Sequence, residues 1–560
     1  MSQGFGVLNV SKSLPSGDVS DKSAGTRVAQ IVSVSGSQAV GVLDGQRTAE
    51  GRIGGARVEI GAMMKVVTPH AAVVAIVSAI TCPIPDQSKR AQSIELIELI
   101  LAGEIKPDRT TRRIVFKRGV ASAPSVGDGV YFATSQDLEL VYANPDTSTI
   151  DVGHLYQDER VPARLVVDEL FGKHFIVVGA TGCGKSSAVS CILQAVLREH
   201  HSAHIVVLDI HHEYPAAFGG LAELIEPSLL RLPFWMMNFE ELALALVGDD
   251  EHRDAEVEIL GDAVLAAKRR YSDSQAGRLR RSHESGAVTV DSPLPFRLSD
   301  VTAHIDEHLG RLERTHVVLP LRRLKNRIET LVNDPRFGFM FGSLVIEDTM
   351  GDILGRIFRI PIDGRPITVI NLALVPAEIL DIVISVISRL AFDLAVCSEG
   401  AMPMLLVCEE AHRYAPATAD GRFLPTRRAL ARIAKEGRKY GISLALITQR
   451  PSELDQTILS QCSTVVAMRL TTERDQQVIR ANSQEGVLDF LDFLPLLADR
   501  EAIILGQGVA MAMRVTFKDI GVSGSLSASQ KSYSTAWKNP TMNREALDGV
   551  IRFWRRGSKS

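Results

Sequence analysis

The sequence of 560 residues lacks the features of disulfide-rich or secreted chains. Its six cysteines are scattered, form no CxxC pair and lie among apolar or glycine-rich neighbours: Cys82, Cys183, Cys191, Cys397, Cys408 and Cys462. Reduced thiols in a cytoplasmic protein are therefore expected. The first residues, MSQGFGVLNVSK, have no basic start followed by an apolar run, so no signal peptide is expected there.

Long apolar runs and a strong net charge are also missing. The stretch AAVVAIVSAI (71–80) is too short to cross a bilayer, and the longer stretch 367–396 is interrupted by charged residues and a proline. We therefore expect no membrane span. The formal net charge of −4 gives no overall attraction to nucleic acid, so such contacts would depend on local basic patches.

Residues 27–134 have the pattern of a small β-barrel or sandwich. They contain short β-rich segments separated by glycine-containing turns, among them VAQIVSV (28–34), AVGVLD (39–44), ARVEIG (56–61), MMKVVT (63–68) and VYFAT (130–134). This spacing predicts an N-terminal β domain that ends near residue 150.

Beyond Val161 the sequence alternates apolar strands with segments of helical length. The strands are apolar on both faces: HFIVV (174–178), HIVVLDI (204–210), ITVINL (367–372), MLLVC (404–408), ISLALIT (442–448) and TVVAMRL (464–470). Such runs predict an α/β fold whose mostly parallel sheet is covered on both sides.

This α/β region is interrupted by a mostly helical stretch, which contains a polar, basic break at KRRYSDSQAGRLRRSHESG (268–286). We interpret the stretch as a helical insertion with a flexible loop, and the serine-rich and basic end of the chain as a tail. The predicted divisions are a β-barrel at 1–150, a core in two parts at 151–215 and 346–520, the insertion at 216–345, and the tail at 521–560.

A phosphate-binding motif follows the strand HFIVV. Its residues match G-x-x-x-x-G-K-[ST] without a mismatch and run into a helical segment: Gly179, Ala180, Thr181, Gly182, Cys183, Gly184, Lys185, Ser186 and then Ser187. Glycines let the backbone N–H groups turn toward phosphate oxygens, and the helix N-terminus faces the same anion. We expect ATP here, with Lys185 at the terminal phosphates and the Ser186 hydroxyl on Mg²⁺.

Polar residues stand where further strands end. In LLVCEEAH (405–412), Glu409 is expected to hold Mg²⁺ although aspartate is usual there, and Glu410 to activate the attacking water. The other strand ends carry Asp209, His212, Glu213, Thr448, Gln449 and Arg450. Because ligands bind at the carboxyl ends of parallel strands, we expect one nucleotide site, in which Gln449 bonds the γ-phosphate or the water. Zinc is not expected, since His211 and His212 have no third ligand nearby.

The segments GATGCGKSSA, LDIHHEY, LLVCEEAHRYAP, EGRKYGISLALITQRPSELD and ILSQCSTVVAMRL, in this order, resemble the HerA branch of the HerA–FtsK motor ATPases. The resemblance implies a RecA-like P-loop core and a homohexameric ring that moves on double-stranded DNA. It further implies that an arginine of the neighbouring subunit completes each ATP site. Arg438 matches that position best, with Arg432 as the alternative, and Lys173 resembles a basic residue used near the nucleotide.

Two functions remain open. One is an ATP-driven DNA translocase or helicase; the other is a ring that scaffolds and regulates a partner enzyme. Relatives of this kind pair with nucleases or with sirtuin-like NAD-degrading effectors in anti-phage systems, or act in DNA end processing, and their barrel is the usual docking surface. A transporter ATPase is disfavoured because no LSGGQ-like signature occurs.

Overall fold

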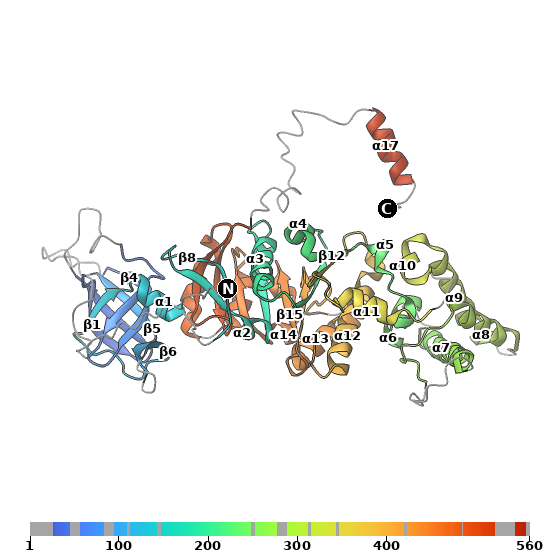
Figure 1. Cartoon of the computed structure of the whole chain (residues 1–560), viewed down its shortest axis with the longest axis horizontal. Helices are drawn as coiled ribbons and strands as arrows, with labels where there is room; N and C mark the ends of the chain where they lie inside the picture. Colours follow the sequence, from blue (N-terminus) through green and yellow to red (C-terminus); the bar gives the residue numbers. More distant parts are fainter. Residues whose placement is uncertain are drawn as a thin grey trace, which may run out of the picture. The chain divides into compact units, whose positions relative to one another are not determined.

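A computed structural model describes most of the chain, namely residues 26–44, 57–82, 95–108, 113–142, 147–247, 253–276, 288–311, 315–342, 347–418, 423–483, 485–520 and 544–555. The chain divides into two compact units, Met1–Val141 and Tyr142–Ser560 (Figure 1). None of the helices in the described ranges is both long and apolar enough to cross a membrane.

The first unit is built on a closed antiparallel barrel. Six strands follow one another in the order β2-β1-β7-β3-β4-β5, and pairing of β2 with β5 closes the ring. The strands are β1 (Ala29–Ser35), β2 (Gln38–Leu43), β3 (Met63–Val67), β4 (Ala72–Thr81), β5 (Leu96–Pro107) and β7 (Gly129–Phe132), with β6 (Ile114–Arg118) added beside β5 and α1 (Ser135–Tyr142) at the end. Alternate residues such as Ile31, Val66 and Leu99 fill the interior.

The predicted barrel is therefore confirmed, with one correction. The expected strand ARVEIG does not form: its described residues 57–61 are irregular and lead into a turn at Gly61, whose φ is +85°. Ile60 in this segment is exposed, so the segment contributes little to the apolar interior that stabilises the strands.

The second unit contains an eleven-stranded sheet in the order β12-β13-β11-β14-β15-β10-β16-β17-β18-β8-β9. The first seven strands are parallel: β12 (Ala222–Ile225), β13 (Ile367–Asn371), β11 (His204–Asp209), β14 (Met404–Cys408), β15 (Ile442–Thr448), β10 (His174–Val178) and β16 (Cys462–Ala467). All six predicted apolar runs are strands of this parallel part. The α/β interpretation is thus confirmed.

The antiparallel end of the sheet was not predicted. It consists of β17 (Glu501–Gly506), β18 (Met513–Phe517), β8 (Thr149–Leu155) and β9 (Pro162–Val166). The helices of the core are α2 (Val167–Phe171), α3 (Lys185–Glu199), α12 (Ala377–Cys397), α13 (Leu424–Glu436), α14 (Gln456–Leu459) and α15 (Glu473–Ala481). Most of α12 is buried, which accounts for the length of the apolar run that begins at residue 367.

The inserted region is mostly helical, as predicted. Its helices are α4 (Pro215–Phe218), α5 (Pro227–Leu230), α6 (Phe239–Leu246), α7 (Arg253–Ala276), α8 (Leu298–Arg311), α9 (Thr315–Asn333) and α10 (Gly338–Phe341), followed by α11 (Met350–Phe358). Two details differ from the prediction. The edge strand β12 lies within this region, and the expected break at residue 268 is helical as far as Ala276, because α7 continues through it.

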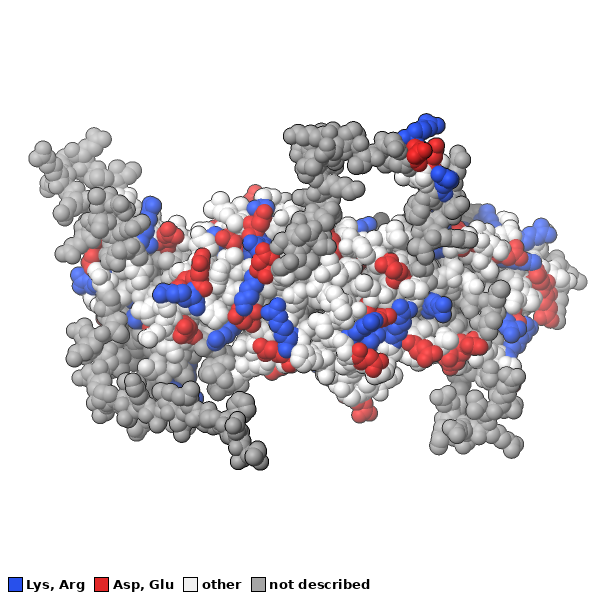
Figure 2. Space-filling view, turned by 45° about the horizontal axis from the view of Figure 1, so that its top comes forward, with Lys and Arg blue, Asp and Glu red and all other residues white. Residues whose placement is uncertain are grey.

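The described residues of the predicted tail, 544–555, form helix α17 (Arg544–Arg555). The rest of the predicted tail, and residues 277–287 of the predicted flexible loop, lie outside the described residues. On the face seen in Figure 2, basic and acidic side chains are interspersed, in keeping with the small net charge of −4.

Candidate nucleotide site

Residues 179–184 connect β10 to α3 in a tight loop. Gly182 and Gly184 have φ values of +80° and +98°, a backbone conformation that favours glycine. A Cβ at Gly179 would lie 2.6 Å from Cys183 Sγ and 2.9 Å from Met468 Cβ. Helix α3 begins at Lys185, so its N-terminus is at the end of the loop. The loop and the helix together form an anion-binding site of the kind that holds phosphates.

The side chains of the loop point toward neighbouring strand ends. The Lys185 ammonium group donates a hydrogen bond to the Ala180 carbonyl oxygen at 3.1 Å. The Thr181 hydroxyl bonds the Gln449 amide oxygen, and the Ser186 hydroxyl bonds the Glu213 carboxylate. The structure therefore brings the loop together with two of the strand ends that the sequence singled out.

Three carboxyl groups gather beside Ser186. Asp209 accepts hydrogen bonds from the backbone N–H groups of Glu213 and Tyr214, both at 3.1 Å. Glu409 Oε2 accepts from the backbone N–H groups of residues 210 and 211, at 3.0 and 3.3 Å. Burial raises the pKa of Glu409 well above its usual range, and the charge of Asp209, a hydrogen bond to it, and Glu213 act in the same direction.

This oxygen-rich cluster suits Mg²⁺, which prefers hydroxyl, carboxylate and water ligands. Within the cluster, the acid bonded to Ser186 is Glu213, whereas Glu409 bonds the end of β11. Among the described residues no group of three or more His, Cys, Asp or Glu side chains has the arrangement of a metal site made by protein alone. The residues present therefore fit a cation that is shared with phosphate oxygens and water.

Glu410 lies at the end of β14 in the left-handed backbone region, with φ of +48°. Its carboxylate is buried and lies 3.2 Å from His412 Nδ1, which is 3.0 Å from the Thr448 hydroxyl. Burial opposes ionisation, but contact with His412 and the charge of Lys185 outweigh it and lower the pKa of Glu410. The group is therefore an ionised base at neutral pH.

One oxygen of this base is available for a further partner. The 3.2 Å contact brings Glu410 Oε2 within ion-pair distance of His412, yet the atom makes no hydrogen bond of acceptable geometry and is buried. A buried acceptor without a hydrogen bond is costly, so a water molecule bound there would be stabilised. This position suits the water that attacks a terminal phosphate.

Two predicted basic residues lie elsewhere. Lys173 immediately precedes β10 and contacts Glu169 and Gln507, while Arg438 lies in the 3₁₀ turn Gly437–Tyr440 that precedes β15. Both therefore stand at the amino ends of strands whose carboxyl ends form the site, roughly 20 Å away along β15 at about 3.3 Å per residue. The structure does not bring them to the phosphate loop of their own chain, because the strands separate them.

Sequence reasoning missed a second support of the loop. The backbone N–H of Ala180 donates to the Arg469 carbonyl oxygen at 2.8 Å, and that of Arg500 donates to the Cys183 carbonyl oxygen at 3.1 Å. Arg469 lies near the end of the apolar run TVVAMRL, and a charged residue at a strand end could have indicated that it lies near the site. Arg500 belongs to the antiparallel end of the sheet, which was not predicted, so nothing in the sequence indicated that it supports the loop.

The fold and the site define a P-loop NTPase with a RecA-like core. Residues 150–391 match the family model described as "Helicase HerA, central domain". This match and the similarity of the chain to curated HerA helicases support a HerA-type P-loop ATPase of the HerA–FtsK superfamily, an enzyme that hydrolyses ATP.

Similar proteins include the DNA double-strand break repair helicase HerA of Pyrococcus furiosus, which is 26% identical over 70% of this chain and 74% of its own length. The protein of that name from Sulfolobus acidocaldarius is 26% identical over 77% of this chain and 80% of its own. Among solved structures, VirB4 of Thermoanaerobacter pseudethanolicus aligns with a TM-score of 0.48 and 15% identity, over 68% of this chain and 98% of that one.

Proposed function

We propose that this chain is an ATP-driven translocase or helicase that acts on double-stranded DNA as a homohexameric ring, with ATP hydrolysed between neighbouring subunits. The observation that carries the proposal is the separation of the catalytic groups. The phosphate loop and the acids lie at one edge of the parallel sheet, whereas Arg438 and Lys173 lie at the other. A site completed by the next subunit brings the two edges together.

The geometry supports the following roles within one subunit. The loop from Gly179 to Ser187 holds the phosphates and Lys185 neutralises them. Ser186, with Glu213 and Glu409 around it, would hold Mg²⁺, which would offset the charge of the phosphate oxygens. Glu410 takes the proton of the attacking water. Gln449, at the end of β15, orients that water or the γ-phosphate.

Arg438 is the better of the two arginines for the role across the subunit boundary. Arg432 is engaged in its own chain, where its guanidinium group lies 4.3 Å from the ring centre of Phe392 and 3.8 Å from Asp393. Arg438 is exposed, and no described residue bonds its side chain. It can therefore reach another subunit without breaking a bond in its own, and counter charge in the transition state.

The action on DNA is supported by the names of the relatives, which are DNA double-strand break repair helicases. Contacts to DNA phosphates make binding weaken as salt rises. A partner effector, either a nuclease or a sirtuin-like NAD-degrading enzyme, docks on the barrel, in an anti-phage system or in DNA end processing. The division into barrel (1–150), core (151–215 and 346–520), insertion (216–345) and tail (521–560) belongs to this proposal.

Mixed rings test the trans site. Arg438→Ala subunits and Glu410→Gln subunits are each expected to hydrolyse ATP poorly and to bind it normally. When the two are mixed, some interfaces pair an intact Arg438 with an intact Glu410, so activity is expected to return in part. Mixing Glu410→Gln with Lys185→Ala is the control, because both changes affect the same edge of the site. No recovery at any ratio would contradict an arginine supplied by the neighbour.

A further inference from the structure

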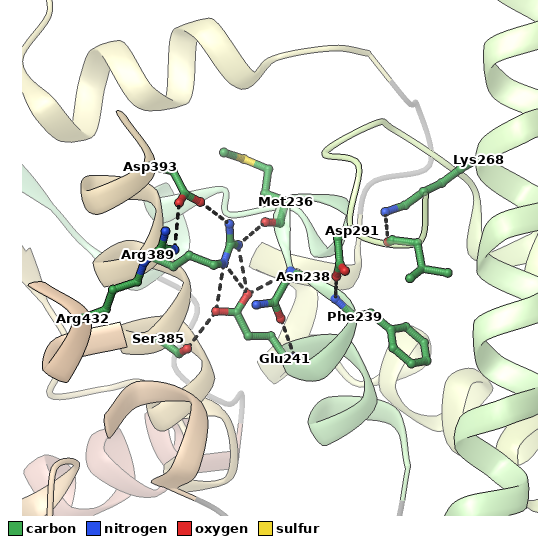
Figure 3. Close-up of polar contacts among 11 residues, drawn as sticks. Met236, Asn238, Phe239, Glu241, Lys268, Asp291, Ser385, Arg389, Asp393 and Arg432 are labelled. Carbon is green, nitrogen blue, oxygen red and sulfur yellow. Dashed lines mark hydrogen bonds and ion pairs between the residues drawn. The ribbon is translucent and has the colours of Figure 1, made fainter. Parts of the chain in front are cut away.

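Helix α6 of the insertion is joined to helix α12 of the core through a buried ion pair (Figure 3). Glu241, 1% exposed, accepts hydrogen bonds from Arg389 Nε at 3.2 Å and Nη2 at 3.0 Å. The Ser385 hydroxyl donates to the same carboxylate at 2.8 Å. The carboxylate is also fixed within α6, because it accepts the backbone N–H of Asn238 in a capping box.

Arg389 uses every nitrogen of its guanidinium group in this link. Besides Glu241, it donates to the Met236 carbonyl oxygen at 2.6 Å and to Asp393 Oδ2 at 3.3 Å. A planar group held at several points fixes orientation as well as distance. Helices α6 and α12 therefore cannot rotate against each other without breaking several buried bonds.

The link continues to α13. Asp393 also contacts Arg432 of α13, whose guanidinium group stacks over Phe392, as noted above. A second connection runs directly from α6, because Glu240 binds Arg428 Nη1 of α13 at 2.6 Å. Two neighbouring glutamates of α6 thus hold two arginines of the core, one on α12 and one on α13.

Helix α13 leads straight into the turn that carries Arg438. The turn has little slack, since a Cβ at Gly437 would lie 2.5 Å from the Ile442 carbonyl oxygen at the start of β15. Helix α13 ends at Glu436, so Gly437 alone lies between the helix and Arg438.

We propose that Arg389 is a positioning residue that makes the helical insertion, α12 and α13 move as one body, so that the position of the insertion sets the reach of Arg438 into the neighbouring ATP site. This inference rests on the proposed role of Arg438. It makes the insertion a control element of hydrolysis, although none of its described helices carries a residue of the ATP site.

The test compares two double substitutions in the full-length protein. Glu241→Gln with Arg389→Met removes the link without leaving a lone buried charge. Glu256→Gln with Arg327→Met is the matched control, because Glu256 is also fully buried and its 3.2 Å contact joins α7 to α9 inside the insertion. The measurements are kcat for ATP and the Kd of a fluorescent ATP analogue.

Both double variants are expected to keep the Kd, since the phosphate loop is untouched. The kcat of the Glu241/Arg389 variant is expected to fall roughly ten- to hundred-fold, as for a misplaced catalytic group, and that of the control to change little. Adding Arg438→Ala to the Glu241/Arg389 variant is expected to give no loss beyond that of Arg438→Ala alone, because both act through one residue.

Three results would overturn the inference: an unchanged kcat, an equal loss in the control, or a loss that multiplies with that of Arg438→Ala. A normal kcat in the single Arg438→Ala variant would instead contradict the proposed role of Arg438 as the trans arginine. That outcome is measured on the single variant and does not depend on the double variants. If the Glu241/Arg389 variant does not assemble, Arg389→Lys serves in its place. Its ammonium group keeps the charge but cannot bond Glu241, Met236 and Asp393 together, so kcat is expected to fall several-fold without a change in the Kd; normal kcat there would also overturn the inference.

Discussion

At the scale of single residues, Glu410 combines local backbone strain with the proposed role of general base. A glutamate with φ of +48° occupies a backbone region that costs roughly 1–2 kcal/mol for a residue with a side chain. Its carboxylate lies 3.2 Å from His412 and is influenced by the charge of Lys185; it is ionised, and one oxygen lacks a hydrogen bond. Strain of this kind is typical of catalytic positions.

Substituting Glu410 by glutamine is expected to separate binding from hydrolysis. The amide has nearly the same shape but cannot accept a proton, so single-turnover hydrolysis should fall by about 10²- to 10⁴-fold while ATP remains bound. Lys185→Ala, in contrast, should lose both properties, because it removes the charge that faces the phosphates. Filter binding measures bound ATP, and the release of product over time measures hydrolysis. Hydrolysis near the normal rate in Glu410→Gln would move the base to Glu213 or Glu409.

At the scale of elements, the His174 side chain links strand β10 to helix α13 and strand β15. It is buried at the start of β10, where Nε2 donates to the Ala434 carbonyl oxygen of α13 and Nδ1 accepts the Leu444 N–H of β15, both at 3.0 Å. These two bonds require a neutral ring with its proton on Nε2. Burial lowers the pKa of His174 below its ordinary value of 6.5.

The stability of the core should therefore depend on pH through His174. Below pH 6.5 His174 binds a proton in the unfolded chain but not in the folded chain. Its contribution to the free energy of unfolding is therefore complete above pH 6.5 and is lost as the pH falls toward the folded pKa. The protein should therefore be less stable at about pH 5.5 than at about pH 7.5, seen as a lower melting temperature. His174→Gln should lose less than wild type over this interval, and the exposed His201→Gln should match wild type. Equal losses in all three would contradict the assignment.

At the scale of the whole molecule, the barrel and the ATPase core have separate interiors. The barrel is a closed ring with its own apolar core, and no residue assigned to the ATP site precedes Lys173. This arrangement agrees with the proposal that the barrel is a platform for a partner.

Removal of residues 1–141 is expected to leave ATP hydrolysis in place and to abolish capture of the partner. ATPase rates of the full-length and shortened proteins measure the first effect. Pull-down of the product of the neighbouring gene, with both forms as bait, measures the second. If both forms recover that product equally, the docking surface lies in the insertion or the tail, and the platform has to be abandoned.

The sequence alone determined the features that depend on local order. The phosphate loop needs glycines and a lysine at fixed spacing, and strands buried on both faces need uninterrupted apolar runs. Both features could therefore be predicted from residues that are close together in the sequence. The barrel was visible for the same reason, except at residues 57–61, where β-rich composition was not matched by burial. Edge strand β12, only four residues long, and the antiparallel strands gave no comparable signal.

Only the tertiary structure decided which distant residues meet. The pairing of Ser186 with Glu213, the support of the loop by Arg469 and Arg500, and the bond between Glu241 and Arg389 each join segments that the sequence treats as independent. The same holds for the placement of Lys173 and Arg438 at the far edge of the sheet. Such contacts depend on strand order and helix packing, which are set by burial summed over the whole core. They therefore produce no recognisable spacing of residues in the sequence.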